Sequence, residues 1–252
     1  MPRSLPLWAT FAEALSLTAR HSVRFFAWTC PIAAAGLSAV GAVALLPDDR
    51  LVFLFAWGSF ALFFFAASCA FFVRTHRMLL IPGEPLAPLL GNTLAMGMWR
   101  YARGLAVIAA LAVPCALAGW LCASRVSLDG LPDSAQAMLW FVLTYLLVQA
   151  GVAKRQLLYL PAVSLRHGRC WRESTAMGRG FGARLVLLNL LSGGYTLGVS
   201  AFAGWMVALV IPDGPQGLLE CLTVVVGLPA QMGCFACLQA ACYRRLSLDS
   251  TA

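Results

Sequence analysis

The run LVFLFAWGSFALFFFAASCAFFV, residues 51–73, contains no charged side chain and decides the fold class of this chain. A helix needs about 20 predominantly apolar residues to cross the hydrocarbon core of a bilayer, and this run supplies them. Arg50 and Arg74 flank it directly. An apolar stretch of this length predicts a membrane-spanning helix, because strands and helices buried in soluble proteins are usually shorter or interrupted by polar residues.

Five further runs have the same character and are free of charged residues, apart from Glu220 near the start of the last. They are 25–46, 104–123, 135–153, 185–211 and 217–243. The composition agrees, because 61% of the residues are hydrophobic and only 11% are charged, whereas soluble domains carry about 25% charged residues. We therefore expect an all-α membrane protein with six transmembrane helices, in which residues 1–252 form a single integral membrane domain.

The charges are distributed unequally between the two sides that these runs define. Of the 18 Lys and Arg residues, 16 fall on the side of both termini, which gives that side a net charge of +12 (16−4) and the other side −4 (2−6). Since Lys and Arg near helix ends are retained in the cytoplasm, both termini are predicted to be cytoplasmic. Lys154 is the only lysine, and this preference for arginine, with abundant alanine, is typical of a high-GC bacterial genome. A bacterial inner membrane is the predicted location.

A short pattern recurs along the chain at a regular interval. It consists of an aromatic residue, a Glu two positions later and an Arg eleven positions after the Glu. The two clear copies are Phe11, Glu13 and Arg24, and Trp171, Glu173 and Arg184. A weaker copy has Asn92 in place of the Glu and keeps Arg103, so that the arginines lie 79 (103−24) and 81 (184−103) residues apart. A fixed period predicts repeated structural units.

The period divides the chain into units of about 5–82, 86–161 and 164–246. Each unit is predicted to begin with an amphipathic helix in the membrane interface and to continue with a transmembrane hairpin. With two spanning helices in each unit, every unit enters the membrane from the same side, so the three repeats are parallel.

The Glu and Arg of each copy fall on one face of a helix, because positions eleven apart differ by only about 20° of rotation. We interpret them as compensating charges and not as catalytic groups. The expected pairs are Glu13 with Arg20 or Arg24, Glu173 with Arg184, and Glu84 with Arg77 or Arg103.

Prolines and glycines give more local expectations. Pro82 and Pro161 each follow a basic pair and a few apolar residues, and proline is expected to stop the helix there. Gly194 and Gly198 form a G-x-x-x-G pair, which predicts close packing of two helix backbones. Prolines inside the spanning runs predict kinks, and they are Pro31, Pro114 and Pro229.

Two segments resemble a known bacterial family. They are Arg74-Thr-His-Arg-Met-Leu-Leu-Ile-Pro-Gly-Glu84 and Arg155-Gln-Leu-Leu-Tyr-Leu-Pro-Ala-Val163, the second followed by Trp171-Arg-Glu. They are similar to six-helix membrane proteins of the YciC type, which are related to the membrane domain of glycerophosphoryl diester phosphodiesterases. Thr75 stands where that family is expected to have Trp. The resemblance implies the six-helix architecture, and the family is largely uncharacterised.

The basic side has two interpretations. Its charges orient the helices, and they also suit binding to anionic lipid headgroups or to an acidic partner, because each basic residue near an anionic leaflet contributes about 1 kcal/mol. The candidate residues for headgroup or partner binding are Arg24, Arg74, His76, Arg77, Glu84, Arg103, Arg155 and Arg184.

Strongly polar residues inside the spanning runs are few, and the candidates are Gln149, Asn189 and Gln231. Interhelical hydrogen bonding is the favoured role, and lining a polar path is the alternative. The chain has no G-x-S-x-G, H-E-x-x-H, Walker or G-x-G-x-x-G sequence, so no catalytic residue, cofactor or metal site is predicted. Cys234 and Cys237 have C-x-x-C spacing within a spanning run, where helix packing is the favoured interpretation.

The sequence therefore favours a non-enzymatic protein with a structural, assembly or envelope-maintenance role. Its expected partners are anionic lipids on the cytoplasmic face and a membrane protein, with no nucleic acid. The alternative is a small-solute or lipid transporter with a cavity between the three repeats. A third hypothesis is an enzyme acting on lipid headgroups, which requires His76, Glu84 and neighbouring arginines to share one pocket.

Overall fold

A computed structural model describes residues 5–45, 50–81, 92–125, 155–165, 170–211 and 216–247, together with separate residues between 136 and 153. Every regular element in these ranges is helical. The α-helices are α1 (Leu7–Arg20), α2 (Ser22–Leu45), α3 (Arg50–Leu80), α4 (Asn92–Arg125), α6 (Leu160–Leu165), α7 (Cys170–Met177), α8 (Gly182–Val210) and α9 (Gln216–Ser247), and a π-helix, η1 (Arg155–Tyr159), precedes α6. The predicted all-α class is confirmed for this part of the chain.

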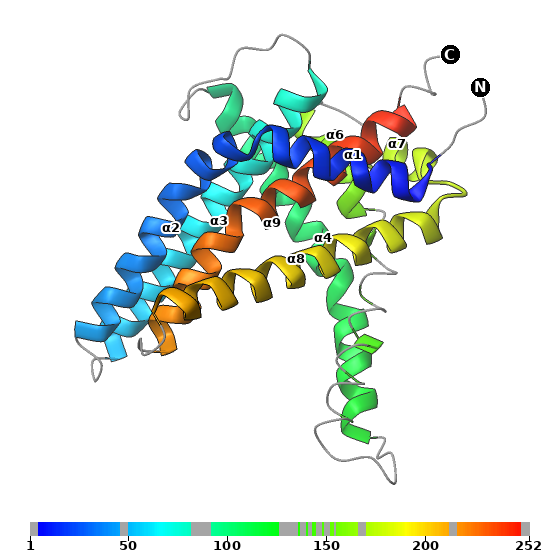
Figure 1. Cartoon of the computed structure of the whole chain (residues 1–252). Coiled ribbons are helices and arrows are strands. Elements are labelled where there is room, and N and C mark those ends of the chain that lie inside the picture. The colour runs from blue at the N-terminus through cyan, green and yellow to red at the C-terminus, as the bar shows by residue number, and fades with distance from the viewer. Residues whose placement is uncertain are drawn as a thin grey trace.

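Helix α9 lies at the centre of the helices that the structure describes. It packs against α1, α2, α3 and α8, and against η1 and α6. Figure 1 shows α2, α3 and α9 running side by side, with α1 crossing them at one end and α8 along another flank. Helix α4 contacts α3 and α6 through its first part and then extends away from the other helices.

Two helices are long and apolar enough to cross a membrane, within the ranges that the structure describes: Phe53–Leu80 and Gly182–Val210. In each, only 22% of the most apolar window is buried, so large apolar side chains face outwards. Phe55 on α3 is 79% exposed and Leu197 on α8 is 73% exposed. Exterior apolar surface of this extent indicates contact with a membrane or another protein in place of water.

Several predicted boundaries change in the structure. The amphipathic stretch 6–24 corresponds to α1 and the start of α2, which are separated by His21 alone. The stretch 86–103 is described only from Asn92, where it forms the first turns of the uninterrupted α4 and not a separate interface helix. Most of the fourth predicted run, 135–153, lies outside the described residues, as does Pro82.

Pro31, Pro114 and Pro229 lie inside α2, α4 and α9 respectively, and the predicted kinks stay a prediction. Pro161 differs, because it does not end a helix but occupies the second position of α6. Proline is tolerated in the first turn of a helix, where its missing N–H would have no intrahelical partner. The helix preceding it has π geometry instead.

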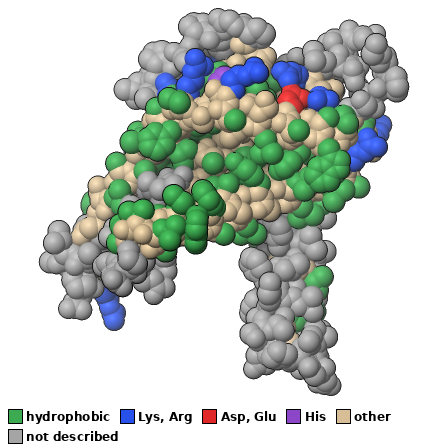
Figure 2. Space-filling view, in the orientation of Figure 1, with side chains coloured by type: hydrophobic (Ala, Val, Ile, Leu, Met, Phe, Trp, Pro, Cys, Tyr) green, Lys and Arg blue, Asp and Glu red, His purple; other side chains and the backbone are tan. Residues whose placement is uncertain are grey.

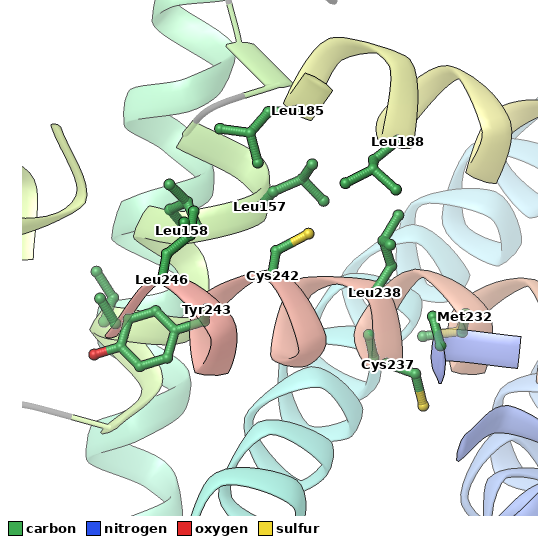
Figure 3. Packing of buried hydrophobic residues seen from close by; sticks show 14 of the residues in the cluster. Leu157, Leu158, Leu185, Leu188, Met232, Cys237, Leu238, Cys242, Tyr243 and Leu246 are labelled. Atoms are coloured by element: carbon green, nitrogen blue, oxygen red, sulfur yellow. The ribbon is translucent and has the colours of Figure 1, made fainter. Parts of the chain in front are cut away.

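The core forms around the second half of α9. Its buried side chains include Cys237, Leu238, Cys242 and Leu246, which are fully inaccessible. Figure 3 shows them beside leucines from η1 and α8. Small residues alternate with these side chains along α9, and small residues let neighbouring helices approach closely.

Among the glycines that the structure describes, Gly233 has the least space for a side chain. A Cβ atom added there would lie 2.5 Å from Cδ2 of Phe25 and 3.3 Å from Cγ2 of Thr18. In contrast, a Cβ added at Gly194 or Gly198 meets no described atom within 4 Å. The prediction that the latter pair brings helix backbones together is therefore wrong for the helices that the structure describes.

We expect Gly233→Ala to destabilise the protein, because Phe25 is fully buried and cannot move aside without disturbing α2. Overpacking of a core typically costs about 1–3 kcal/mol, so the apparent melting temperature in detergent should fall. Gly198→Ala is the matched control, since it adds the same methyl group where space is open. Equal melting temperatures for the two variants would contradict the close packing at Gly233.

Candidate functional site

Glu13 is held by arginines from the opposite end of the sequence. Its Oε2 atom accepts bonds from Nη2 of Arg245 at 2.6 Å and from Nε of the same residue at 3.0 Å, and its Oε1 atom pairs with Arg244. The predicted pairing of Glu13 with Arg20 or Arg24 is wrong. Arg24 belongs to α2, beyond the break at His21, and Glu13 on α1 faces α9, whose arginines hold the carboxylate.

We expect Glu13→Lys to weaken the attachment of α1 to α9, because two favourable pairs become repulsive. Limited proteolysis of the purified protein should then cleave near α1 faster. A second substitution, Arg245→Glu, should restore much of the protection, whereas Arg20→Glu should not. Both are arginine-to-glutamate changes in the last turn of a helix, so equal rescue would refute the observed pairing.

Gln239 forms the centre of a buried polar network. Its Oε1 atom lies 2.9 Å from Nε2 of His76 on α3, and its Nε2 atom donates to the backbone oxygen of Gln156 on η1 at 3.0 Å. It also forms a hydrogen bond with the Tyr101 hydroxyl on α4. Gln156 in turn accepts a hydrogen bond from Asn189 on α8 at 3.0 Å. The network therefore joins five helices.

The π-helix explains why the Gln156 carbonyl is available to Gln239. In a π-helix, each carbonyl accepts from the N–H five residues later. For Gln156 that residue is Pro161, which has no N–H. A carbonyl left without its backbone donor in a half-buried position needs another partner, and the Gln239 amide supplies it.

His76 is a headgroup-binding candidate that the structure places in the interior, with no exposed surface. Because the Gln239 oxygen can only accept, the Nε2 atom of His76 is the donor. Its Nδ1 atom and the hydroxyl of the neighbouring Thr75 are buried without a hydrogen-bond partner. Direct contact between His76 and a lipid headgroup or soluble substrate is thus blocked in this conformation, and Glu84, its proposed companion, lies outside the described residues.

The intramembrane polar candidates bond to separate partners. Asn189 donates to Gln156, and Gln231 donates to Oγ of Ser200 at 2.7 Å. Both bonds join neighbouring helices, which agrees with the favoured interhelical role. Gln149 lies outside the described residues.

Gln239, at the centre of the buried polar network, and its partner Tyr101 were not among the functional residues predicted from the sequence. Only one signal pointed to Gln239: it is an amide within an otherwise apolar and small-residue stretch of α9. Its several partners come from three other helices, so no spacing along the chain could have identified them.

We expect Gln239→Leu to be strongly destabilising, since it leaves the His76, Tyr101 and Gln156 groups buried without this partner. Each orphaned group costs about 1–3 kcal/mol, so the loss should be about 3 kcal/mol or more. Thermal unfolding in detergent should show a larger decrease than for the control Gln231→Leu, which orphans one half-buried hydroxyl. The double variant His76→Leu/Gln239→Leu should lose less than the sum of the single losses, and strict additivity would contradict the network.

The arginine candidates occupy different environments. Arg24 is exposed and its Nη1 lies 3.5 Å from Sδ of Met78, and Arg184 is exposed and donates to the Leu5 carbonyl at 3.3 Å. Arg103 is exposed on α4 and Arg77 is half-buried in the last turn of α3.

Two arginines are held against indole rings. The guanidinium carbon of Arg74 lies 5.4 Å from the ring centroid of Trp28, and that of Arg155 lies 3.6 Å from the centroid of Trp171. Both are half-buried, because an aromatic face covers one side of a planar guanidinium while leaving its edge available for hydrogen bonds.

The exposed arginines on the predicted cytoplasmic side are here called the basic surface. Its members are Arg20, Arg24, Arg103, Arg172, Arg179 and Arg184, and the exposed Arg244 is left out because it pairs with Glu13. Figure 2 shows Lys and Arg side chains gathered at the end of the molecule where α1 lies, above a surface in which hydrophobic side chains predominate. A charged end next to an apolar flank suits the boundary between water and a bilayer.

The cysteines in the core are free thiols, including Cys234 and Cys237, which are fully buried. Cys237 is hydrogen-bonded to Thr18 and Cys234 to Ser192, so both contact neighbouring helices. Among the described residues, no group of three His, Cys, Asp or Glu side chains lies close enough to hold a metal ion.

Comparison of this chain with protein-family models, curated proteins and solved structures gives no match.

Proposed function

We propose that this chain is a polytopic bacterial inner-membrane protein with six transmembrane helices in three parallel repeats and both termini in the cytoplasm. In this proposal it has a non-enzymatic role in the structure, assembly or maintenance of the envelope. It acts by binding anionic lipid, or an acidic membrane-protein partner, at its cytoplasmic face. The resemblance to the YciC-type family favours the same architecture.

The observation that carries this proposal is the basic surface beside two exposed apolar helices. Helix α3 has 31 residues and extends about 46 Å at 1.5 Å per residue, whereas the hydrocarbon core is only about 30 Å thick. A helix of that length places its basic end, with Arg74 and Arg77, among the headgroups when its apolar part spans the core. Cations at that level attract anionic lipid.

The transport alternative has less support. It requires polar side chains to share a cavity between the repeats, but Asn189 and Gln231 are each engaged with a different neighbour. A pocket of about 650 Å³ between α2 and α3 is lined mostly by Ala and Phe side chains and contains neither residue. An apolar groove on the outer flank of two helices suits an acyl chain better than a polar solute.

The proposal predicts that the protein enriches anionic lipids around itself. When it is extracted from bacterial membranes in polymer nanodiscs, the copurifying lipid should contain a higher fraction of phosphatidylglycerol and cardiolipin than the bulk membrane. Replacing Arg20, Arg24 and Arg184 by Gln should reduce this excess, because each basic residue contributes about 1 kcal/mol near an anionic leaflet. Lipid mass spectrometry measures both fractions.

Arg50→Gln is the control, since Arg50 is exposed at the start of α3, on the side predicted to face away from the cytoplasm. It should leave the lipid fractions unchanged. A wild-type protein whose copurifying lipid matches the bulk membrane would overturn the proposed role in binding anionic lipid.

A further inference from the structure

We propose that Arg103, Arg155 and Tyr159 form a site for the phosphodiester group of one anionic lipid. This inference rests on the proposed function and deepens it. The proposed function gives the basic surface a general attraction for anionic lipid, and this inference assigns one lipid molecule to one site. Trp171 and Thr175 contact Arg155 and hold its guanidinium in place.

Arg155 is positioned by two contacts from α7. Its guanidinium stacks on the Trp171 ring at 3.6 Å, and its Nη1 atom donates to Oγ1 of Thr175 at 2.6 Å. The Thr175 hydroxyl itself donates to the Trp171 carbonyl at 2.8 Å. The planar group is therefore fixed before any ligand arrives, and a fixed guanidinium loses less entropy on binding.

Arg103 lies on α4 where this helix packs against Tyr159 and Leu160. The next residue, Gly104, lets α4 approach closely, because a Cβ there would lie 3.2 Å from Cδ2 of Leu160 and 3.4 Å from Cε1 of Tyr159. Both guanidinium groups act electrostatically on the Tyr159 phenol, which places the phenol near Arg103 and Arg155 alike. The Tyr159 ring also meets the Trp171 ring edge-on, with centroids 5.4 Å apart.

The Tyr159 phenol is protonated and can donate a hydrogen bond to an anion. Burial lowers the pKa of the Arg155 guanidinium, with Tyr159 acting in the opposite direction. Burial also raises the pKa of Tyr159, as does Cys170 to a smaller extent, while Arg103 and Arg155 oppose the rise. The phenol therefore keeps its proton at neutral pH and offers a donor. Two guanidinium groups and a phenol hydroxyl together match the oxygens of a phosphate.

The surface around the site indicates a lipid as the source of that phosphate. One turn before Arg103 on α4, Trp99 is 73% exposed, and beyond Arg103 the exposed residues Val113 and Leu117 are apolar. An exposed Trp, then Arg, then apolar residues is the order found where a helix passes from the headgroups into the hydrocarbon. A lipid phosphate bound at Arg103 would place its acyl chains along that apolar stretch.

The test uses the full-length protein in phosphatidylcholine nanodiscs to which phosphatidylglycerol is added, with retained lipid detected by native mass spectrometry. One phosphatidylglycerol should remain bound to the wild type. Arg103→Gln/Arg155→Gln should weaken that retention about tenfold, as expected for the loss of charge-assisted hydrogen bonds. Arg103→Gln alone, at an exposed position, should weaken it in part and does not disturb the packing on Trp171.

The control is Arg50→Gln, which removes one charge, as Arg103→Gln does, from an exposed position outside the basic surface. It should retain the lipid as the wild type does. Equal loss in Arg50→Gln and Arg103→Gln would overturn the site, because removal of any one positive charge would then have the same effect. Absence of anionic enrichment in the wild type would instead overturn the proposed function itself.

A competition experiment with inorganic phosphate distinguishes a lipid headgroup from free phosphate as the ligand. Phosphate at millimolar concentration should not displace the bound phosphatidylglycerol, since it lacks acyl chains to pack along α4. Displacement at that concentration would show that the site takes free phosphate, which would overturn the assignment to a lipid.

Discussion

The hydrogen bonds of Gln239 are the constraint on which the interior of this protein depends. A single amide on the central helix α9 contacts His76, Tyr101 and the Gln156 carbonyl. In a dry interior, a polar group without a partner is costly. The helices that supply these partners are therefore held at one depth and one rotation relative to α9, which apolar packing alone specifies less strictly.

The same network accounts for an irregular backbone at η1. The π-helix and Pro161 leave a carbonyl that the local chain cannot satisfy, and this carbonyl is used as an acceptor for α9. The irregular segment also carries Arg155 and Tyr159 on the side toward α4 and α7. The same five-residue element thus carries both an interior acceptor, the Gln156 carbonyl, and a half-buried arginine, Arg155.

Most of the charged groups that the structure describes lie outside this interior, at the end of the molecule where α1 crosses α9. Glu13 neutralises part of the charge of Arg244 and Arg245 and fastens α1 across α9. The arginines of the basic surface remain exposed. The end of the molecule therefore combines a structural ion pair with cations that are accessible to a ligand, and only the structure distinguishes the two kinds.

The sequence by itself predicted apolar helices where α2, α3, α4, α8 and α9 lie, because the length of a charge-free apolar run acts locally. It also located the polar amides Asn189 and Gln231 and favoured their interhelical role. It did not determine which residues contact one another. Glu13 pairs with arginines more than 230 positions away, and close packing occurs at Gly233 and not at Gly198. His76 is buried, whereas a position at the membrane interface was expected. These contacts depend on the rotation of each helix about its axis and on the angles at which the helices cross. Both are set by packing around α9, to which segments distant in the sequence contribute.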